Sequence, residues 1–193
     1  MVDFLKSAGI FVYPLGLCSV VGIFIIFERL FALRRSAVLP DDLVDAIVAG
    51  RPVSGGMSSV LARVIAFAEA HRHDGEAVKS FARLEVNRME RGLVFLEIII
   101  GAAPLLGLLG TVVGLVQVFD KFATEAGVPN QAAFSQGIAL ALSTTVLGLI
   151  IAIPCLVGNS YLQRRIETYA VQLESLIERF DASVGRSRDE AAS

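Results

Sequence analysis

Charged residues are scarce in this 193-residue chain. They make up 19% of the sequence, whereas hydrophobic residues make up 54% and the mean hydropathy is +0.66. Because a soluble domain usually carries about 25% charged residues, we expect a membrane protein. The net charge of −2 gives no reason to expect nucleic-acid binding, so no nucleic-acid partner is expected.

Cysteine, histidine and tryptophan are also rare or absent. Cys18 and Cys155 each lie inside an apolar run, which argues against a disulfide scaffold and a zinc site. His71 and His73 look like loop residues, and we predict no metal site. Since tryptophan is absent, Phe and Tyr must supply the aromatic side chains of a membrane interface. We also expect no enzyme, because no nucleophile–base pair or phosphate-binding glycine loop lies in an accessible segment.

Three long segments contain no charge at all. They are residues 7–27, residues 98–119 and the apolar stretch 137–162. A helix needs about 20 apolar residues to cross a bilayer, so the sequence predicts an all-α protein with three transmembrane helices. The first segment could instead be a cleaved signal peptide. Its length and the charged ERLFALRR that follows it favour a retained anchor.

The basic residues predict the orientation of the three spans. Fifteen of the 17 Lys and Arg residues fall in segments 28–97 and 164–193, and basic segments favour the cytoplasmic side. The predicted order is therefore an N-terminal stub and first span with the N-terminus outside (1–27), a cytoplasmic helical region (28–97), the second span (98–119), a periplasmic loop (120–136), the third span (137–162) and a cytoplasmic C-terminal helix and tail (163–193).

Helical periodicity continues beyond the second and third spans. Apolar spacing predicts one helix over about 76–119, with Pro104 as a candidate kink. A heptad pattern extends the third helix over about 137–181; its apolar positions are Leu162, Ile166, Tyr169, Leu173, Leu176 and Phe180. We expect two long antiparallel helices that extend into the cytoplasm, a shape suited to building oligomers.

Small residues form stripes inside the second and third spans. Glycines that permit helix packing lie in the second span at Gly107, Gly110 and Gly114. In the third span, Ala141, Thr145, Gly148 and Ala152 follow i, i+4, i+7 and i+11. These spacings predict one face of each helix that another helix can approach closely.

Hydroxyl groups, rather than ionisable groups, are the polar content of the spans. Ser143, Thr144 and Thr145 are consecutive and cannot share one helix face, so at least one should point at a neighbour or a cavity. Thr111 has two readings: a hydroxyl in a path, or a structural bond to its own i−4 carbonyl. Glu97 lies fourteen residues earlier on nearly the same face. It is either a cytoplasmic exit group for protons or an ordinary interfacial carboxylate near Arg91.

Two segments carry a family resemblance. Residues 102–119, AAPLLGLLGTVVGLVQVF, followed by residues 137–154, GIALALSTTVLGLIIAIP, resemble the paired signature of the MotA/TolQ/ExbB proton-channel family. The first span, with Pro14, Ser19 and its terminal ERLFALRR, is similar to the family's amino-terminal span. The resemblance covers the three spans and the charge topology, about half of the chain.

The resemblance implies a homo-pentameric ring in the bacterial inner membrane. The ring would surround the transmembrane helices of an ExbD-like or TolR-like dimer, whose aspartate takes up and releases the proton. Thr111 and Thr145 occupy the family's two threonine positions and, with Thr144, would line this proton pathway. The motor would use the proton motive force, with H⁺ favoured over Na⁺ and no cofactor, to rotate the dimer and act on a TonB-like or other envelope protein.

One position departs from the family pattern, and other readings stay open. Where ExbB and TolQ proteins usually carry a glutamate, this chain has Leu140. The expected apolar seal of the pore comprises Leu105, Leu108, Val112, Leu140 and Leu147. The sequence does not choose between an ExbB-like and a TolQ-like branch. The alternative function is a non-conducting membrane assembly scaffold, which would explain the glycine stripes but not three consecutive hydroxyls.

Overall fold

The computed structural model describes residues 9–49, 51, 59–71, 74–124 and 131–192. Every regular element among these residues is helical, in the order η1 (Gly9–Phe11), α2 (Val12–Ala32), α3 (Arg35–Val38), α4 (Asp41–Val48), α5 (Val60–Ala70), α6 (Gly75–Glu90), α7 (Leu93–Thr124) and α8 (Gln131–Ala192). The all-α prediction is confirmed. The N-terminal residues 1–8, His73 and the centre of the predicted periplasmic loop lie outside the described residues.

Three helices of the described part are long and apolar enough to cross a membrane. These candidate spans are Val12–Ala32, Leu93–Asp120 and Gly137–Phe180. The second and third candidate spans contain the uncharged segments 98–119 and 137–162, and the first overlaps the segment 7–27 over residues 12–27. The pentameric ring and the cytoplasmic extensions remain predictions.

The chain forms two compact units. The first contains residues 1–27 and 93–160, and the second contains residues 28–92 and 161–193. Helices α2 and α8 each contribute residues to both units.

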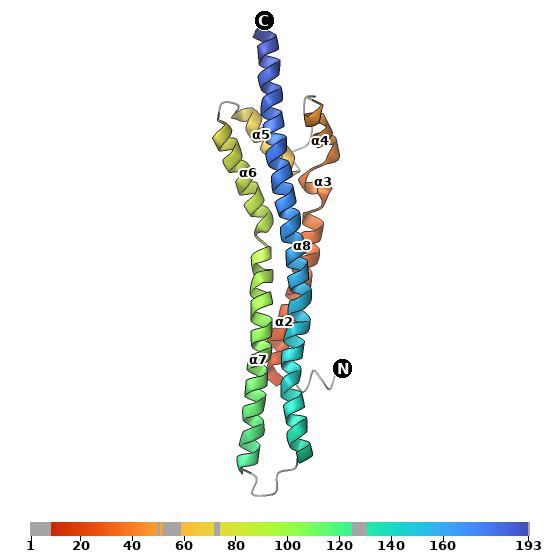
Figure 1. Ribbon diagram of the computed structural model, residues 1–193, viewed down its shortest axis with the longest axis vertical. Coiled ribbons are helices and arrows are strands. Elements are labelled where there is room, and N and C mark those ends of the chain that lie inside the picture. The colour runs from red at the N-terminus through yellow and green to blue at the C-terminus, as the bar shows by residue number, and fades with distance from the viewer. Residues whose placement is uncertain (1–8, 50, 52–58, 72–73, 125–130, 193) are drawn as a thin grey trace. The chain divides into compact units, whose positions relative to one another are not determined.

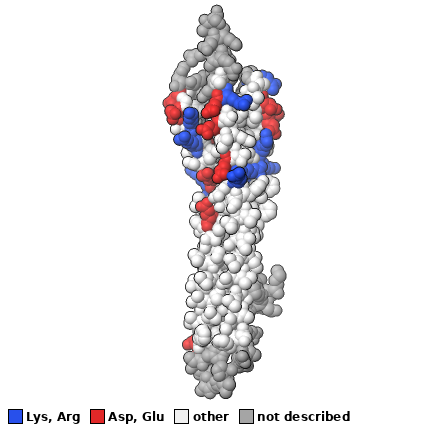
Figure 2. Space-filling view, in the orientation of Figure 1, with Lys and Arg blue, Asp and Glu red and all other residues white. Residues whose placement is uncertain are grey.

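The helices of the first unit are η1, the part of α2 up to Phe27, α7 and the first part of α8. Within it, α7 and α8 lie side by side (Figure 1). Helix α2 packs on α8 through small residues, because a Cβ on Gly22 would lie 2.6 Å from the Cys155 Sγ and a Cβ on Gly158 would lie 2.8 Å from the Ile26 Cδ1. The surface over α7 and the first part of α8 is almost uncharged (Figure 2), as a lipid-facing surface requires.

The second unit contains the short helices, and side-chain caps fix where two of them begin. The Ser59 hydroxyl accepts the Ala62 N–H at 3.1 Å at the start of α5. The Asp74 carboxylate accepts the Ala77 N–H at 2.9 Å at the start of α6. Each cap satisfies a backbone N–H that has no partner within the helix. The two helices then pack together, with the rings of Phe67 and Phe81 stacked at 4.3 Å.

The heptad pattern of the C-terminal helix forms the core of this second unit. Six positions of α8 predicted to be apolar contacts are all buried: Leu162, Ile166, Tyr169, Leu173, Leu176 and Phe180. The Tyr169 hydroxyl also donates to the Leu33 carbonyl at 3.1 Å. The prediction of a packed apolar stripe on this helix is confirmed.

The single helix predicted over about 76–119 is wrong, because it is interrupted at Arg91 and Gly92. Glycine has a low helix propensity, and the space beside Gly92 is taken: a Cβ there would lie within 3 Å of three atoms of the Arg29 side chain. The other predicted helix, 137–181, is longer than expected, since α8 runs from Gln131 to Ala192.

Candidate functional site

Helices α7 and α8 approach each other closely where their small residues meet. A Cβ on Gly107 would lie 2.7 Å from the Thr144 carbonyl oxygen and 2.9 Å from the Thr145 Cα. A Cβ on Gly114 would lie 2.8 Å from the Ala141 Cβ. Because real Cβ contacts are longer than this, the observed helix separation requires glycine at both positions.

The α8 side of the same contact surface also contains small residues. A Cβ on Gly148 would lie only 2.5 Å from the Ala103 carbonyl oxygen. Ala141 and Ala152, assigned to this stripe by their spacing, are both buried. The structure therefore brings the glycines of α7 and the small residues of α8 against each other.

Three hydroxyl groups lie together at this contact. The Thr111 Oγ1 is 2.6 Å from the Thr145 Oγ1 and 3.4 Å from the Thr144 Oγ1. Thr111 and Thr144 are 7% and 2% exposed, while Thr145 is half-buried. These three threonines are the ones that the sequence assigned to a proton pathway, and the fold joins them into one hydroxyl cluster.

Two backbone carbonyls complete the hydroxyl cluster. The Thr111 hydroxyl lies 3.2 Å from the Gly107 carbonyl oxygen and 3.1 Å from the Ala141 carbonyl oxygen. The Thr144 hydroxyl lies closer to the same two oxygens, at 2.9 Å and 2.8 Å. Each carbonyl also takes the backbone N–H four residues later in its helix, so each has one lone pair left for a side chain.

The bond between Thr111 and Thr145 can run in either direction. A hydroxyl has one proton to donate and can accept as well. Thr145 can donate to Thr111, or it can accept from Thr111 and offer its own proton to a group outside the cluster. Because Thr145 is the least buried of the three, it is the member that such a group would reach. The cluster itself contains no ionisable side chain, so it can relay a proton only between external groups.

Ser143 does not join the hydroxyl cluster. Its hydroxyl donates to the Ala139 carbonyl at 2.9 Å, on its own helix. The three consecutive hydroxyls of α8 therefore separate, with Thr144 and Thr145 facing α7. This agrees with the expectation that at least one of them points at a neighbour.

The other residues assigned to the pathway have different surroundings. Glu97, the candidate exit group, is exposed near the start of α7. Leu105, Leu108 and Val112, three of the expected seal residues, are each at least half exposed, so they are available to lipid or another chain. Leu147 is half-buried, and the side chain of Leu140 lies outside the described residues.

Two buried polar residues, Glu85 and Asn159, were not identified from the sequence. Glu85, only 1% exposed, pairs with Arg63 and Arg88 of the second unit, each at 2.5 Å. The i, i+3 spacing signals the pair with Arg88, but nothing local indicates Arg63. Asn159 is also buried, and its Oδ1 has no hydrogen-bond partner in the described part of the chain.

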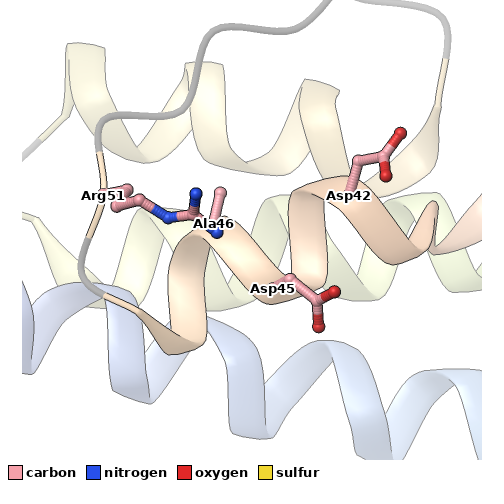
Figure 3. Close-up of a pocket in the computed structure, with 4 residues that line it drawn as sticks. All are labelled: Asp42, Asp45, Ala46 and Arg51. Carbon is pink, nitrogen blue, oxygen red and sulfur yellow. The ribbon is translucent and has the colours of Figure 1, made fainter.

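Outside the hydroxyl cluster, we examined metal-ligating side chains and one pocket in the described residues. They contain no group of three or more His, Cys, Asp or Glu side chains placed to hold a metal ion. An open pocket beside α4 is lined by Asp42, Asp45, Ala46 and Arg51 (Figure 3). Its polar groups are two carboxylates and one guanidinium, which do not form a nucleophile–base pair.

The chain is similar to known membrane transport proteins. Residues 54–175 match the model of the MotA/TolQ/ExbB proton channel family. The biopolymer transport protein exbB1 of Vibrio cholerae is 28% identical over 186 residues, which cover 88% of this chain and 82% of that protein. A protein described as an ExbB homologue of Methanothermobacter thermautotrophicus is 28% identical over 189 residues, covering 90% of this chain and 67% of its own.

A shorter match has a higher identity. The biopolymer transport protein ExbB of Aquifex aeolicus is 37% identical over 101 residues, covering 52% of this chain and 67% of that protein. The family match spans more than half of the chain and includes all three threonines of the hydroxyl cluster. The chain therefore belongs to the MotA/TolQ/ExbB proton channel family, as a multi-pass membrane protein with a role in energising transport.

Proposed function

We propose that this chain is the channel and stator subunit of an ExbB–ExbD-like or TolQ–TolR-like motor. The motor uses the proton motive force to rotate a partner dimer and to energise an envelope or outer-membrane transport process. The observation that carries the proposal is the Thr111–Thr145 hydroxyl pair, 2.6 Å apart, inside the segments 98–119 and 137–162, which contain no Asp, Glu, Lys or Arg.

The titratable group must then come from the partner. The family resemblance implies a transmembrane aspartate on an ExbD-like or TolR-like dimer. Thr145, being half-buried, donates to or accepts from that aspartate, directly or through water. Thr111 stabilises either state, because its bond to Thr145 can reverse. Protonation neutralises the aspartate and removes the cost of moving a charge past apolar walls.

The proton supplies work only when the pore does not leak. Each charge that crosses is worth about 2.3 kcal/mol per 100 mV, which an open water path would dissipate. We assign the seal to the exposed apolar residues Leu105, Leu108 and Val112 of α7, together with Leu147 and Leu140. Leu140 replaces the usual glutamate with an apolar side chain, so proton entry here relies on the hydroxyl pair and the partner.

The proposed assembly is a homo-pentamer around the partner dimer in the bacterial inner membrane. The N-terminus is periplasmic and the C-terminus cytoplasmic, as the distribution of Lys and Arg supports. The translocated ion is H⁺, no cofactor takes part, and Glu97 receives the proton at the cytoplasmic end. A TonB-like or other envelope protein receives the force.

One observation favours the alternative, a non-conducting assembly scaffold. Each of the three threonines has a hydrogen-bond partner inside the chain, as structural hydroxyls in membrane helices do. A scaffold, however, has no need for a half-buried hydroxyl at the edge of the cluster. The two functions differ in whether the complex conducts.

Proton uptake into liposomes separates the two functions. The complex is purified from native membranes through a tag on this chain, so that its partner is retained, and a potassium diffusion potential drives uptake. We expect flux for the wild type, a loss of tenfold or more for Thr145→Val, and no loss for the matched control Ser143→Ala. An intact complex without flux supports the scaffold. Flux that survives Thr145→Val removes the hydroxyl pair from the pathway.

A further inference from the structure

Thr144 has the most buried hydroxyl of the cluster, yet its contacts differ from those of the other two. At 2% exposure it is the member least accessible to a partner's aspartate. Its close contacts are two backbone carbonyls, those of Gly107 and Ala141, and its hydroxyl neighbour within the described part of the chain is Thr111, at 3.4 Å. A side chain that relays a proton must pass it to another group that can relay it further. The groups next to the Thr144 hydroxyl are backbone carbonyls, which accept a hydrogen bond but do not relay a proton.

Without Thr144, the Gly107 and Ala141 carbonyls would be the usual hydrogen-bond acceptors for the Thr111 and Thr145 hydroxyls. A threonine in a membrane helix commonly donates to the carbonyl four residues earlier. That carbonyl is Gly107 for Thr111 and Ala141 for Thr145. The Thr144 hydroxyl lies between these two oxygens, one on α7 and one on α8, and contacts both.

The distances indicate which hydroxyl makes the stronger hydrogen bonds to the Gly107 and Ala141 carbonyls. Thr144 is 2.9 Å from the Gly107 oxygen and 2.8 Å from the Ala141 oxygen, whereas Thr111 is 3.2 Å and 3.1 Å from them. One proton shared between two acceptors is a three-centre hydrogen bond. Thr144 takes the remaining lone pair of the Gly107 and Ala141 carbonyl oxygens. The Thr111 hydroxyl therefore bonds to the Thr145 hydroxyl, which is 2.6 Å away.

We propose that Thr144 is a positioning residue rather than a carrier of protons. Its hydroxyl holds the Gly107 and Ala141 carbonyls and so directs the Thr111 and Thr145 hydroxyls toward each other. This revises the role that the sequence assigned to Thr144. The effect on flux rests on the proposed function, whereas the hydrogen-bond arrangement does not.

The backbone of α7 supports this role independently. A Cβ on Gly110 would lie 2.8 Å from the Thr144 Oγ1, 2.9 Å from its Cβ and 3.0 Å from its Cγ2. The missing side chain of Gly110 therefore provides the space that Thr144 fills. A Cβ at residue 110 would therefore displace the Thr144 side chain from the place where it meets both carbonyls.

A stability cycle tests the arrangement without any partner. Thr111→Val, Thr145→Val and the double variant are made in the wild-type, Thr144→Ser and Thr144→Val backgrounds. Thermal unfolding in detergent is followed with a thiol-reactive dye in a Cys18→Ala background, so that the signal reports exposure of the buried Cys155. A double-mutant cycle isolates the coupling between the two threonines.

We expect the shifts in unfolding temperature to be non-additive in the wild-type and Thr144→Ser backgrounds, because serine keeps the hydroxyl. In the Thr144→Val background the shifts should become additive, since each threonine then bonds to its own helix. Coupling that persists with Thr144→Val overturns the proposal. Additivity in the wild type shows that the Thr111–Thr145 bond itself is absent, which also overturns it.

Flux provides the second readout. In the purified complex, Thr144→Val should lower proton uptake by about tenfold, and Thr144→Ser should restore it to within about twofold of the wild type. A Thr144→Val complex that conducts like the wild type contradicts the positioning role. If the wild-type complex conducts nothing, the proposed function fails, while the stability cycle still decides the hydrogen-bond arrangement.

Discussion

Thr111 of α7 and Thr145 of α8 form a hydroxyl–hydroxyl hydrogen bond of 2.6 Å between two membrane helices. The bond depends on glycine, because a Cβ on Gly107 would meet the backbone of Thr144 and Thr145. Close helix approach and hydroxyl pairing are therefore one feature, in which the small residues bring the polar groups within hydrogen-bonding distance.

Gly107→Ala should separate the two helices at the hydroxyl cluster. The new methyl group would meet backbone atoms of α8 at 2.7–2.9 Å, and a backbone cannot rotate away as a side chain can. We expect a loss of about 2 kcal/mol, within the usual range for overpacking, measured by thermal unfolding in detergent. Gly101→Ala is the matched control, since nothing lies within 4 Å of its Cβ position. A Gly107→Ala chain as stable as Gly101→Ala would refute the close approach.

Gly22→Ala should destabilise the packing of α2 through one side chain only. The introduced Cβ would lie 2.6 Å from the Cys155 Sγ, so adding Cys155→Ala should restore most of the loss. The expected initial cost is about 1–2 kcal/mol, measured by circular dichroism during heating. Gly16→Ala, with open space around it, should cost nothing. Failure of Cys155→Ala to compensate would mean that α2 contacts α8 differently.

Arg63→Met should destabilise the second unit by leaving Glu85 with one of its two arginines. Glu85 is 1% exposed, but the Arg63 side chain is 39% exposed, so we expect about 2 kcal/mol rather than the 3–5 kcal/mol typical of a fully buried pair. Adding Glu85→Met removes the buried charge and should recover much of the stability. Chemical denaturation of the wild type and these two variants measures the effect. Equal stability of Arg63→Met and the wild type would show that the buried carboxylate does not need Arg63.

Tyr169→Phe should leave the buried Leu33 carbonyl without the hydroxyl that now donates to it at 3.1 Å. An unsatisfied buried carbonyl costs about 1–2 kcal/mol, so the unfolding temperature should fall. Tyr161→Phe is a suitable control because Tyr161 is exposed. If the two variants unfold at the same temperature, water replaces the Tyr169 hydroxyl without loss.

Patterns that repeat along the chain predicted the fold well. The uncharged runs located the three candidate spans, and the heptad spacing from Leu162 to Phe180 identified a buried stripe, because both depend on burial averaged over many residues. The break at Gly92 was missed. It depends on where the Arg29 side chain packs, and no local pattern records that.

The candidate site was predicted in composition but not in detail. Spacing and resemblance singled out Thr111, Thr144 and Thr145, yet they could not tell which hydroxyls bond to each other. That depends on the register of α7 against α8, which is a tertiary property. The same reason explains why Arg63 could not be paired with Glu85, which lies 22 residues away.

The central claim is that the Thr111 and Thr145 hydroxyls act as one unit in proton transfer. The most direct measurement is a double-mutant cycle on proton uptake by liposomes that contain the purified complex. Residues that act as a unit give strongly non-additive losses. We predict that Thr111→Val and Thr145→Val each lower the flux tenfold or more, and that the double variant is no worse than either one. Losses that multiply, or a flux that either variant leaves unchanged, would contradict the account.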